Sequence, residues 1–174
     1  GAVHAIGGAN SVSGVTSLGA AGIRNGGNLR ILAGGMTNDG VFSVNSQPGV
    51  NGTQLDVAED ATIDGTGRID LNLDDGNNDF TDAQFRTVEG AVAHLGASHT
   101  VSGKGRMNGA WLNDGTISAD RPGQDLQLLG VIDQSGGGQI RSDDGFAVLF
   151  GVDVIGGSFN STGAGAVLAQ GTAG

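Results

Sequence analysis

Apolar and polar residues alternate along short stretches of the chain, and this pattern predicts half-buried β-strands. Ile69, Leu71 and Leu73 would point to one side of such a strand, with the polar residues between them on the other. The same alternation recurs at Leu126 and Leu128. A pair of strands this short cannot bury its apolar side alone, so we expect each pair to be covered by neighbouring strands of a stacked repeat.

Two short patterns recur and predict that repeat. Residues 62–69 (TIDGTGRI) match residues 100–107 (TVSGKGRM) at an offset of 38 (100 − 62), and residues 38–44 (NDGVFSV) match residues 113–119 (NDGTISA) at an offset of 75 (113 − 38). A unit of roughly 19 residues would generate both offsets and lies close to the range of solenoid repeats.

Glycines within these patterns are predicted to form the turns between strands, because they permit positive φ. The predicted turn positions are Gly40, Gly65, Gly67, Gly103, Gly105, Gly115, Gly136, Gly138 and Gly145. Arg68 and Arg106 occupy equivalent places in the first pattern. On a unit of that length they would stack two coils apart, with outward Asp side chains as their partners.

Together the strands and turns predict an all-β fold, a parallel β-helix (β-solenoid) of roughly 8–9 coils. Composition supports this, because Gly occupies 35 of the 174 positions and the chain holds 16 Asp but only 2 Glu, which disfavours helices. We expect residues 1–174 to be a single solenoid domain, a segment of a longer repetitive protein. Residues 74–89 break the alternation and predict a projecting loop. A β-sandwich with similar turns is the alternative fold.

Two phrases resemble the repeats of large bacterial surface proteins. Residues 34–44 (GGMTNDGVFSV) and 112–119 (LNDGTISA) are similar to coils of filamentous-haemagglutinin-like adhesins and autotransporter passengers. The resemblance implies a right-handed β-helix, secretion to the cell surface, and a structural or adhesive role in a bacterial surface or biofilm matrix. It carries no catalytic residues to this chain, and we expect no enzyme activity.

These observations predict a stalk or fibre-forming unit. Stacked coils make a stiff rod, and uncapped terminal coils would allow head-to-tail or lateral self-assembly into filaments. Glycans or a host cell surface are the other expected partners. The net charge is −10 and the eight basic residues are scattered, which argues against nucleic-acid binding. No apolar run approaches the roughly 20 residues of a membrane span, so no membrane insertion is expected.

Calcium is the one cofactor that the sequence suggests. Residues 70–76 (DLNLDDG) begin like a calcium-binding loop, although one Asp is extra and Thr81 stands where the closing Glu belongs. If residues 68–73 form a strand, the remaining ligands would be Asp74, Asp75 and Asp79. The alternative is a solvated acidic turn.

A carbohydrate-active or carbohydrate-binding β-helix, such as a polysaccharide lyase or a tailspike, is the alternative function. It would require a groove on one long face, lined by acids, a basic residue and Trp111. Trp111 is the only Trp, and it would either stack on a sugar or be buried at a coil corner. The positions of His94 and His99 differ by an odd number of residues. On one strand their side chains would therefore point to opposite sides and could not bind the same metal ion.

Overall fold

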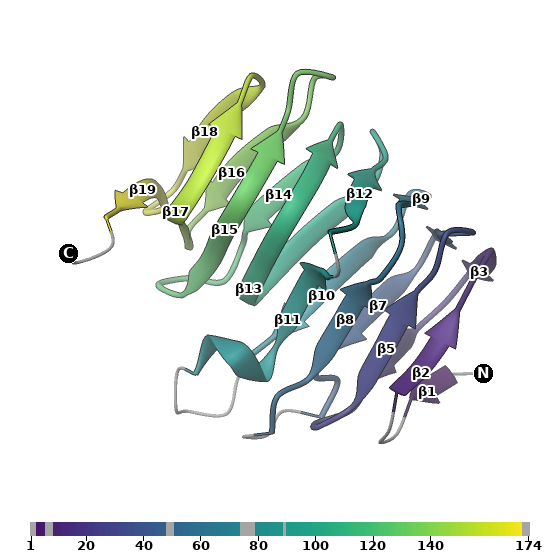
Figure 1. Cartoon of the computed structure of the whole chain (residues 1–174). Helices are drawn as coiled ribbons and strands as arrows, with labels where there is room; N and C mark the ends of the chain where they lie inside the picture. The colour runs from purple at the N-terminus through teal and green to yellow at the C-terminus, as the bar shows by residue number, and fades with distance from the viewer. Residues whose placement is uncertain (1–2, 6–8, 48–50, 74–78, 89, 172–174) are drawn as a thin grey trace.

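The computed structural model in Figure 1 is a parallel β-solenoid. It describes residues 3–5, 9–47, 51–73, 79–88 and 90–171. Each strand pair found within these residues is parallel, and successive coils stack along one axis. The predicted all-β β-helix is therefore confirmed. The alternative β-sandwich is wrong, because sandwiches of that kind are built from antiparallel sheets.

The coils have three faces, which we name A, B and C. Face A holds β1 (Val3–Ala5), β4 (Ala21–Ile23), β7 (Val41–Val44), β10 (Arg68–Asn72), the start of β13 (Thr100–Asn113), β14 (Thr116–Ala119), β16 (Gln139–Asp143) and β18 (Ser158–Thr162). Within the described ranges these eight strands define eight coils, in agreement with the 8–9 predicted.

The other two faces share three long strands. Face B holds β2 (Ala9–Val12), β5 (Asn28–Ile31), β8 (Gln54–Val57), β11 (Gln84–Thr87), the middle of β13, the first parts of β15 (Asp125–Asp133) and β17 (Phe146–Ile155), and β19 (Ala166–Gln170). Face C holds β3 (Val15–Ser17), β6 (Met36–Asn38), β9 (Ala61–Asp64), β12 (Val92–Leu95) and the last parts of β13, β15 and β17.

Columns of inward side chains, one from each coil, make the core. The register of face A aligns Phe42, Ile69, Val101, Ile117 and Ile140. The register of face B aligns Leu55, Phe85, Met107 and Leu128. All of these side chains are buried. Each is worth about 1.5–3 kcal/mol of hydrophobic free energy, so the alternation read from the sequence stabilises the stack directly.

Strand β13 bends round two corners without a break. Its residues pair with face A up to Lys104 and with face B from Gly105 onward. Gly103 and Gly109 have φ of 105° and 117°, a conformation that residues with a Cβ rarely adopt. Gly103 and Gly105 thus lie inside a bent strand, and not in the turns that the sequence predicts for them.

The remaining predicted turn glycines lie between strands: Gly40, Gly65, Gly67, Gly115, Gly136, Gly138 and Gly145. Some of them form a column where the chain enters face A. A Cβ added to Gly67 would lie 2.2 Å from the Gly40 carbonyl oxygen, and one on Gly138 would lie 1.9 Å from that of Asn113. Successive coils therefore approach too closely at this corner for a side chain to point along the stack.

The offset between the two copies of the first pattern does not correspond to stacked coils. Ile63 lies on face C and Val101 on face A, so the two matching phrases occupy different corners. The prediction that Arg68 and Arg106 stack is wrong, because Arg68 is in β10 on face A and Arg106 is in β13 on face B. Each corner needs glycine and small polar residues. The same sequence pattern therefore occurs at different corners and does not identify equivalent positions in successive coils.

The predicted loop over residues 74–89 is wrong in its second half. Gln84–Thr87 form β11, which pairs with β8 and β13 on face B. A short 3-10 helix, Phe80–Asp82, precedes it. Residues 74–78 lie outside the described part of the chain. Coil length can be counted between aligned residues of face A. The coil from Arg68 to Thr100 is about twice as long as the next coil, from Thr100 to Thr116.

His99 takes the place of a glycine in the corner column. The Thr100 amide donates to Gly67 O at 3.2 Å, and the Thr116 amide donates to His99 O at 3.0 Å, so His99 stands directly between Gly67 and Gly115. Its side chain is fully buried, and neither ring nitrogen has a hydrogen-bond partner within the described structure. Burial lowers the pKa of His99, and the nearby Gly65 backbone and the carboxylates of Asp64 and Asp39 oppose this only in part.

We expect the free energy of unfolding to fall as the pH decreases below about 6.5, the ordinary His pKa. The folded pKa lies below the unfolded one, so the unfolded state binds the proton first and stability rises with pH through this window. Urea unfolding followed by Trp111 fluorescence between pH 8 and 5.5 measures the slope. His99→Gln should flatten the slope, because it removes the buried titratable ring. Equal slopes in wild type and His99→Gln would contradict the assignment.

Candidate functional site

A polar groove of about 490 Å³ crosses the outer side of face A. Its polar walls are formed by Asp39, Arg68, Thr100, Thr116, Asp120 and Arg141. Ser102 and Ser118 also line it, and both are nearly fully buried. The residues come from β7 through β16 and their turns, so the groove follows the stacking axis.

Strand alternation aims the hydroxyl groups outward. Thr100 and Ser102 flank the inward Val101 in β13, and the register places Thr116 opposite Thr100 and Ser118 opposite Ser102. Adjacent strands lie about 4.8 Å apart, so four hydroxyl-bearing residues make a compact array on two neighbouring coils. This array is not among the features predicted from the sequence, although Thr100–Ser102 and Thr116–Ser118 share the pattern T-x-S.

Hydrogen bonds between coils hold the edge of the groove in place. Arg121 Nη2 reaches both carboxylate oxygens of Asp70 at 3.2 Å, spanning from β10 past β13. Asp120 Oδ1 accepts from the Gly103 amide at 3.0 Å. These contacts position the carboxylate of Asp120 at the groove without neutralising it by an ion pair.

Arg141 is already committed to a neighbour. Its Nε lies 2.6 Å from Asp143 Oδ2, and Asp143 also accepts from Ser118 Oγ at 3.1 Å and Thr162 Oγ1 at 2.8 Å. Burial acts to raise the pKa of Asp143, but these hydrogen bonds and the Arg141 charge outweigh it, so the pKa is lowered. Asp143 therefore stays ionised and keeps Arg141 paired.

Arg68 and Ser102 differ from these paired groups. Arg68 is exposed and forms no ion pair or side-chain hydrogen bond with any described residue. The Ser102 hydroxyl is buried and has no hydrogen-bond partner within the described structure. A free guanidinium and an unsatisfied hydroxyl thus line one groove, and a buried polar group of this kind is costly without a partner.

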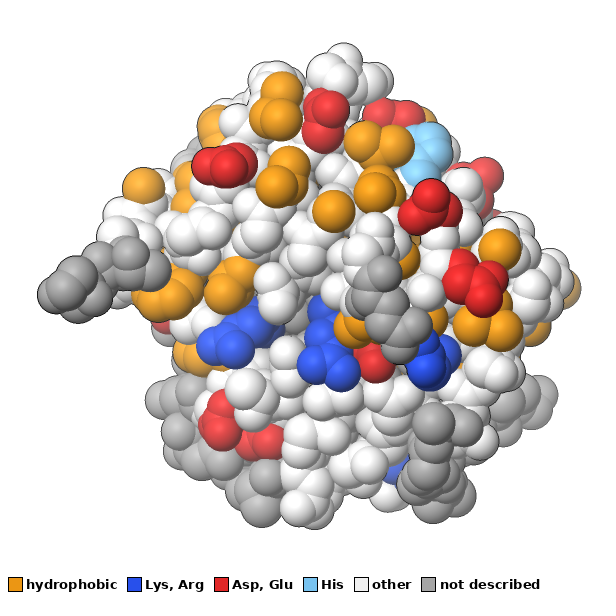
Figure 2. Space-filling view, viewed as in Figure 1, with side chains coloured by type: hydrophobic (Ala, Val, Ile, Leu, Met, Phe, Trp, Pro, Cys, Tyr) orange, Lys and Arg blue, Asp and Glu red, His pale blue; other side chains and the backbone are white. Residues whose placement is uncertain are grey.

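The cations of face B, by contrast, pair with their own neighbours. Figure 2 shows Lys and Arg side chains across the middle of this face. Arg86 Nε lies 2.6 Å from Asp56 Oδ1 and its Nη2 lies 2.7 Å from Gln54 Oε1. Arg106 donates to Gln127 Oε1 at 3.0 and 3.2 Å. This ladder of side chains links coils, and it offers a ligand fewer free donors than the groove does.

Trp111 does not line the groove. It is 1% exposed and packs in the core against Phe85, with 4.5 Å between the ring centroids and 59° between the planes. Of the two predicted environments of Trp111, burial is confirmed and stacking on a sugar at the surface is wrong, although the residue lies within strand β13 and not at a corner. The inward column of face C places it between Ala93 and Ile132.

The predicted calcium ligands cannot be compared as a set. Asp74 and Asp75 lie outside the described residues. Asp79 caps the 3-10 helix, where its Oδ1 accepts from the Thr81 amide at 2.9 Å and the Thr81 hydroxyl at 2.8 Å, and these bonds lower its pKa. No group of three or more His, Asp or Glu side chains suited to a metal occurs within the described ranges.

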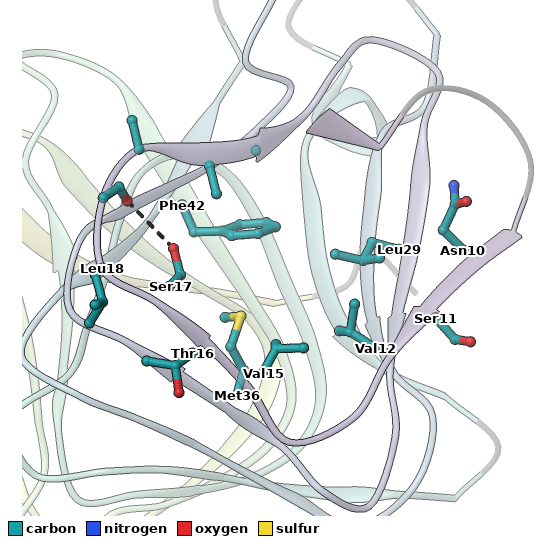
Figure 3. Close-up of a pocket in the computed structure, with 14 residues that line it drawn as sticks. Asn10, Ser11, Val12, Val15, Thr16, Ser17, Leu18, Leu29, Met36 and Phe42 are labelled. Carbon is teal, nitrogen blue, oxygen red and sulfur yellow. Dashed lines mark hydrogen bonds between the residues drawn. The ribbon is translucent and has the colours of Figure 1, made fainter. Parts of the chain in front are cut away.

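A second hollow, about 470 Å³ in volume, opens at the N-terminal end of the solenoid. Figure 3 shows its walls, where Val12, Val15, Leu29, Met36 and Phe42 surround the opening. Leu18 at the rim is 79% exposed. These side chains belong to the first coils, so the hollow is the interior of the solenoid seen from its end.

Comparison of the chain with models of protein families, with curated proteins and with solved structures finds no match. Within the described residues, no helix has the length and apolar character needed to cross a membrane.

Proposed function

We propose that this protein is a structural rod that assembles head to tail by coil stacking, as a stalk or fibre unit of a bacterial surface or matrix. The observation that carries the proposal is the apolar hollow at the N-terminal end. Its lining side chains, among them Val12, Val15 and Leu29, belong to the columns that elsewhere form the core. Apolar surface of this kind is expected to be covered by a partner.

The last described coil offers the complementary surface. Phe159 in β18 lies opposite Ile140, so it continues the inward column of face A. Ile140 is fully buried, whereas Phe159 is 48% exposed. Val167 in β19 continues a face B column in the same way, opposite Ala147. Of the described strands, only β16 pairs with β18 and only β17 pairs with β19, so within the described residues Phe159 and Val167 have no further layer above them.

A second copy fits this end better than an unrelated partner. Both ends present parallel strands, so the first coil of one copy would follow the last coil of another as coils follow one another within the chain. Free backbone groups on such edges favour pairing with another strand. The contact joins two different surfaces and does not close on itself, so repeated contacts produce a filament. Secretion and an adhesive role follow from the family resemblance and form part of the proposal.

Sedimentation velocity over a hundredfold range of concentration, with electron microscopy of the same samples, tests the proposal. We expect long filaments at high concentration. Phe159→Glu should shift the chain to monomers, because it places a charge in the stacking surface. Leu112→Glu is the matched control, since Leu112 is 45% exposed on face C, away from both ends, and should leave assembly unchanged.

Two results would overturn the proposal. One is a monomer at every concentration. The other is an equal loss of assembly in both variants, which would indicate nonspecific or lateral association. Circular dichroism of each variant establishes that the fold is retained.

A further inference from the structure

We propose that the groove on face A binds an acidic polysaccharide. This site is independent of the proposed assembly, because it lies on a lateral face and not at a coil end. A sugar chain presents many hydroxyl groups, each of which donates and accepts hydrogen bonds. The groove supplies both kinds of partner, with carboxylates at Asp39 and Asp120 and hydroxyls at Thr100 and Thr116.

Arg68 is the feature that specifies an acidic sugar. Its guanidinium is exposed and forms no ion pair with any described residue, while Arg141 at the other side is held by Asp143. A planar guanidinium matches a carboxylate or sulfate group with two parallel hydrogen bonds. One free cation beside two carboxylates and several hydroxyls favours a chain that carries both anionic groups and hydroxyl groups, and disfavours a chain of anionic groups alone.

The carboxylates are prepared to accept from sugar hydroxyls. Asp39 Oδ1 accepts from the Thr66 amide at 2.8 Å and its hydroxyl at 3.2 Å, and Asp120 Oδ1 accepts from the Gly103 amide at 3.0 Å. These bonds fix both side chains before a ligand arrives, which reduces the entropy lost on binding. Neither carboxylate is paired with a cation in the described structure.

Ser102 gives a second, independent indication. The residue lines the groove and is 1% exposed, and its hydroxyl oxygen is buried without a hydrogen-bond partner within the described structure. A buried hydroxyl without a partner is destabilising by itself. Ser102 lies two residues from Thr100 and opposite Ser118, so a sugar chain along the outer side of face A passes over it. A small movement of the side chains that cover its hydroxyl would then let a sugar hydroxyl supply that partner.

The shape of the groove favours a polymer. Its lining residues run from β7 to β16 through β10, β13 and β14. That path covers four interstrand steps, or about 19 Å along the axis at about 4.8 Å for each step. A linear chain laid along the axis would follow the groove, and its volume lies in the range of ligand sites.

Isothermal titration with polygalacturonate, a chain of sugar carboxylates, tests the site, with dextran as the neutral chain and inorganic phosphate as the free anion. We expect polygalacturonate to bind, with an affinity that falls as salt is raised, and the other two to bind at least tenfold more weakly. Arg68→Ala should weaken binding about tenfold and Ser102→Ala about threefold. Arg106→Ala on face B removes the same charge outside the groove and should have no effect.

Equal binding of dextran would overturn the role of Arg68 in selecting an acid, and tighter binding of phosphate would indicate a simple anion site. Absence of polygalacturonate binding at millimolar concentration, or equal losses in Arg68→Ala and Arg106→Ala, would overturn the site itself. Circular dichroism of Ser102→Ala separates a folding defect from a binding defect. Sedimentation of the same preparations records assembly separately, so failure of this site and failure of coil stacking are distinguishable.

Discussion

Replacing Trp111 with alanine is expected to lower the free energy of unfolding by about 3–5 kcal/mol. Trp111 is among the largest fully buried side chains and lies against Phe85 in the middle of the stack. Its removal would leave a cavity between coils that the surrounding backbone, hydrogen-bonded along the axis, cannot collapse to fill. Urea unfolding followed by circular dichroism measures the change, because the variant lacks the fluorescent side chain.

Trp111→Phe is the matched control. It keeps an aromatic ring against Phe85 and removes the indole Nε1, which is buried without a hydrogen-bond partner in the described structure. We expect this variant to lose less than about 1.5 kcal/mol. Alanine and phenylalanine variants of equal stability would show that Trp111 does not support the core as described.

Gly130→Ala is expected to cost about 3 kcal/mol or more. Gly130 has φ of 95°, and a Cβ there would lie 2.2 Å from Gly109 O and 2.9 Å from Gly109 N. The obstructing atoms are backbone of the neighbouring coil, paired in register with Gly130, and cannot rotate away. The substitution therefore strains φ and separates two coils at once.

Two further glycines separate these causes. Gly123 has φ of 64° with open space around it, so Gly123→Ala should cost about 1 kcal/mol from backbone strain alone. Gly19 has neither a positive φ nor an atom within 4 Å of an added Cβ, and Gly19→Ala should change stability by less than about 0.5 kcal/mol. Thermal unfolding of all three variants gives the comparison. A Gly130→Ala variant as stable as Gly123→Ala would contradict the close approach of the coils.

The candidate groove illustrates the limit of reading sites from this sequence. A sugar site predicted from the sequence would contain acids, a basic residue and Trp111, but the fold buries Trp111. Thr100 and Thr116 are separated along the chain and become neighbours only through the register of β13 and β14. The repeat pattern predicts a stack of Arg68 on Arg106, whereas the folded coils put these two side chains on different faces.

The fold class of this protein follows from its amino-acid order alone. Period-two alternation at Ile69, Leu71 and Leu73 gives the strand an apolar side that must be covered by other strands. Frequent glycines allow the chain to bend at the corners between strands, so that successive coils can stack into a solenoid. The identity of each residue's neighbours, in contrast, is set by the folded stack. A long coil that ends at Thr100 is followed directly by a short one that ends at Thr116, because connections of different length can leave and re-enter the same stack at small cost in free energy. The register between strands is set by the burial of whole columns of inward side chains from successive coils. A short sequence pattern covers only one coil and therefore cannot specify this register.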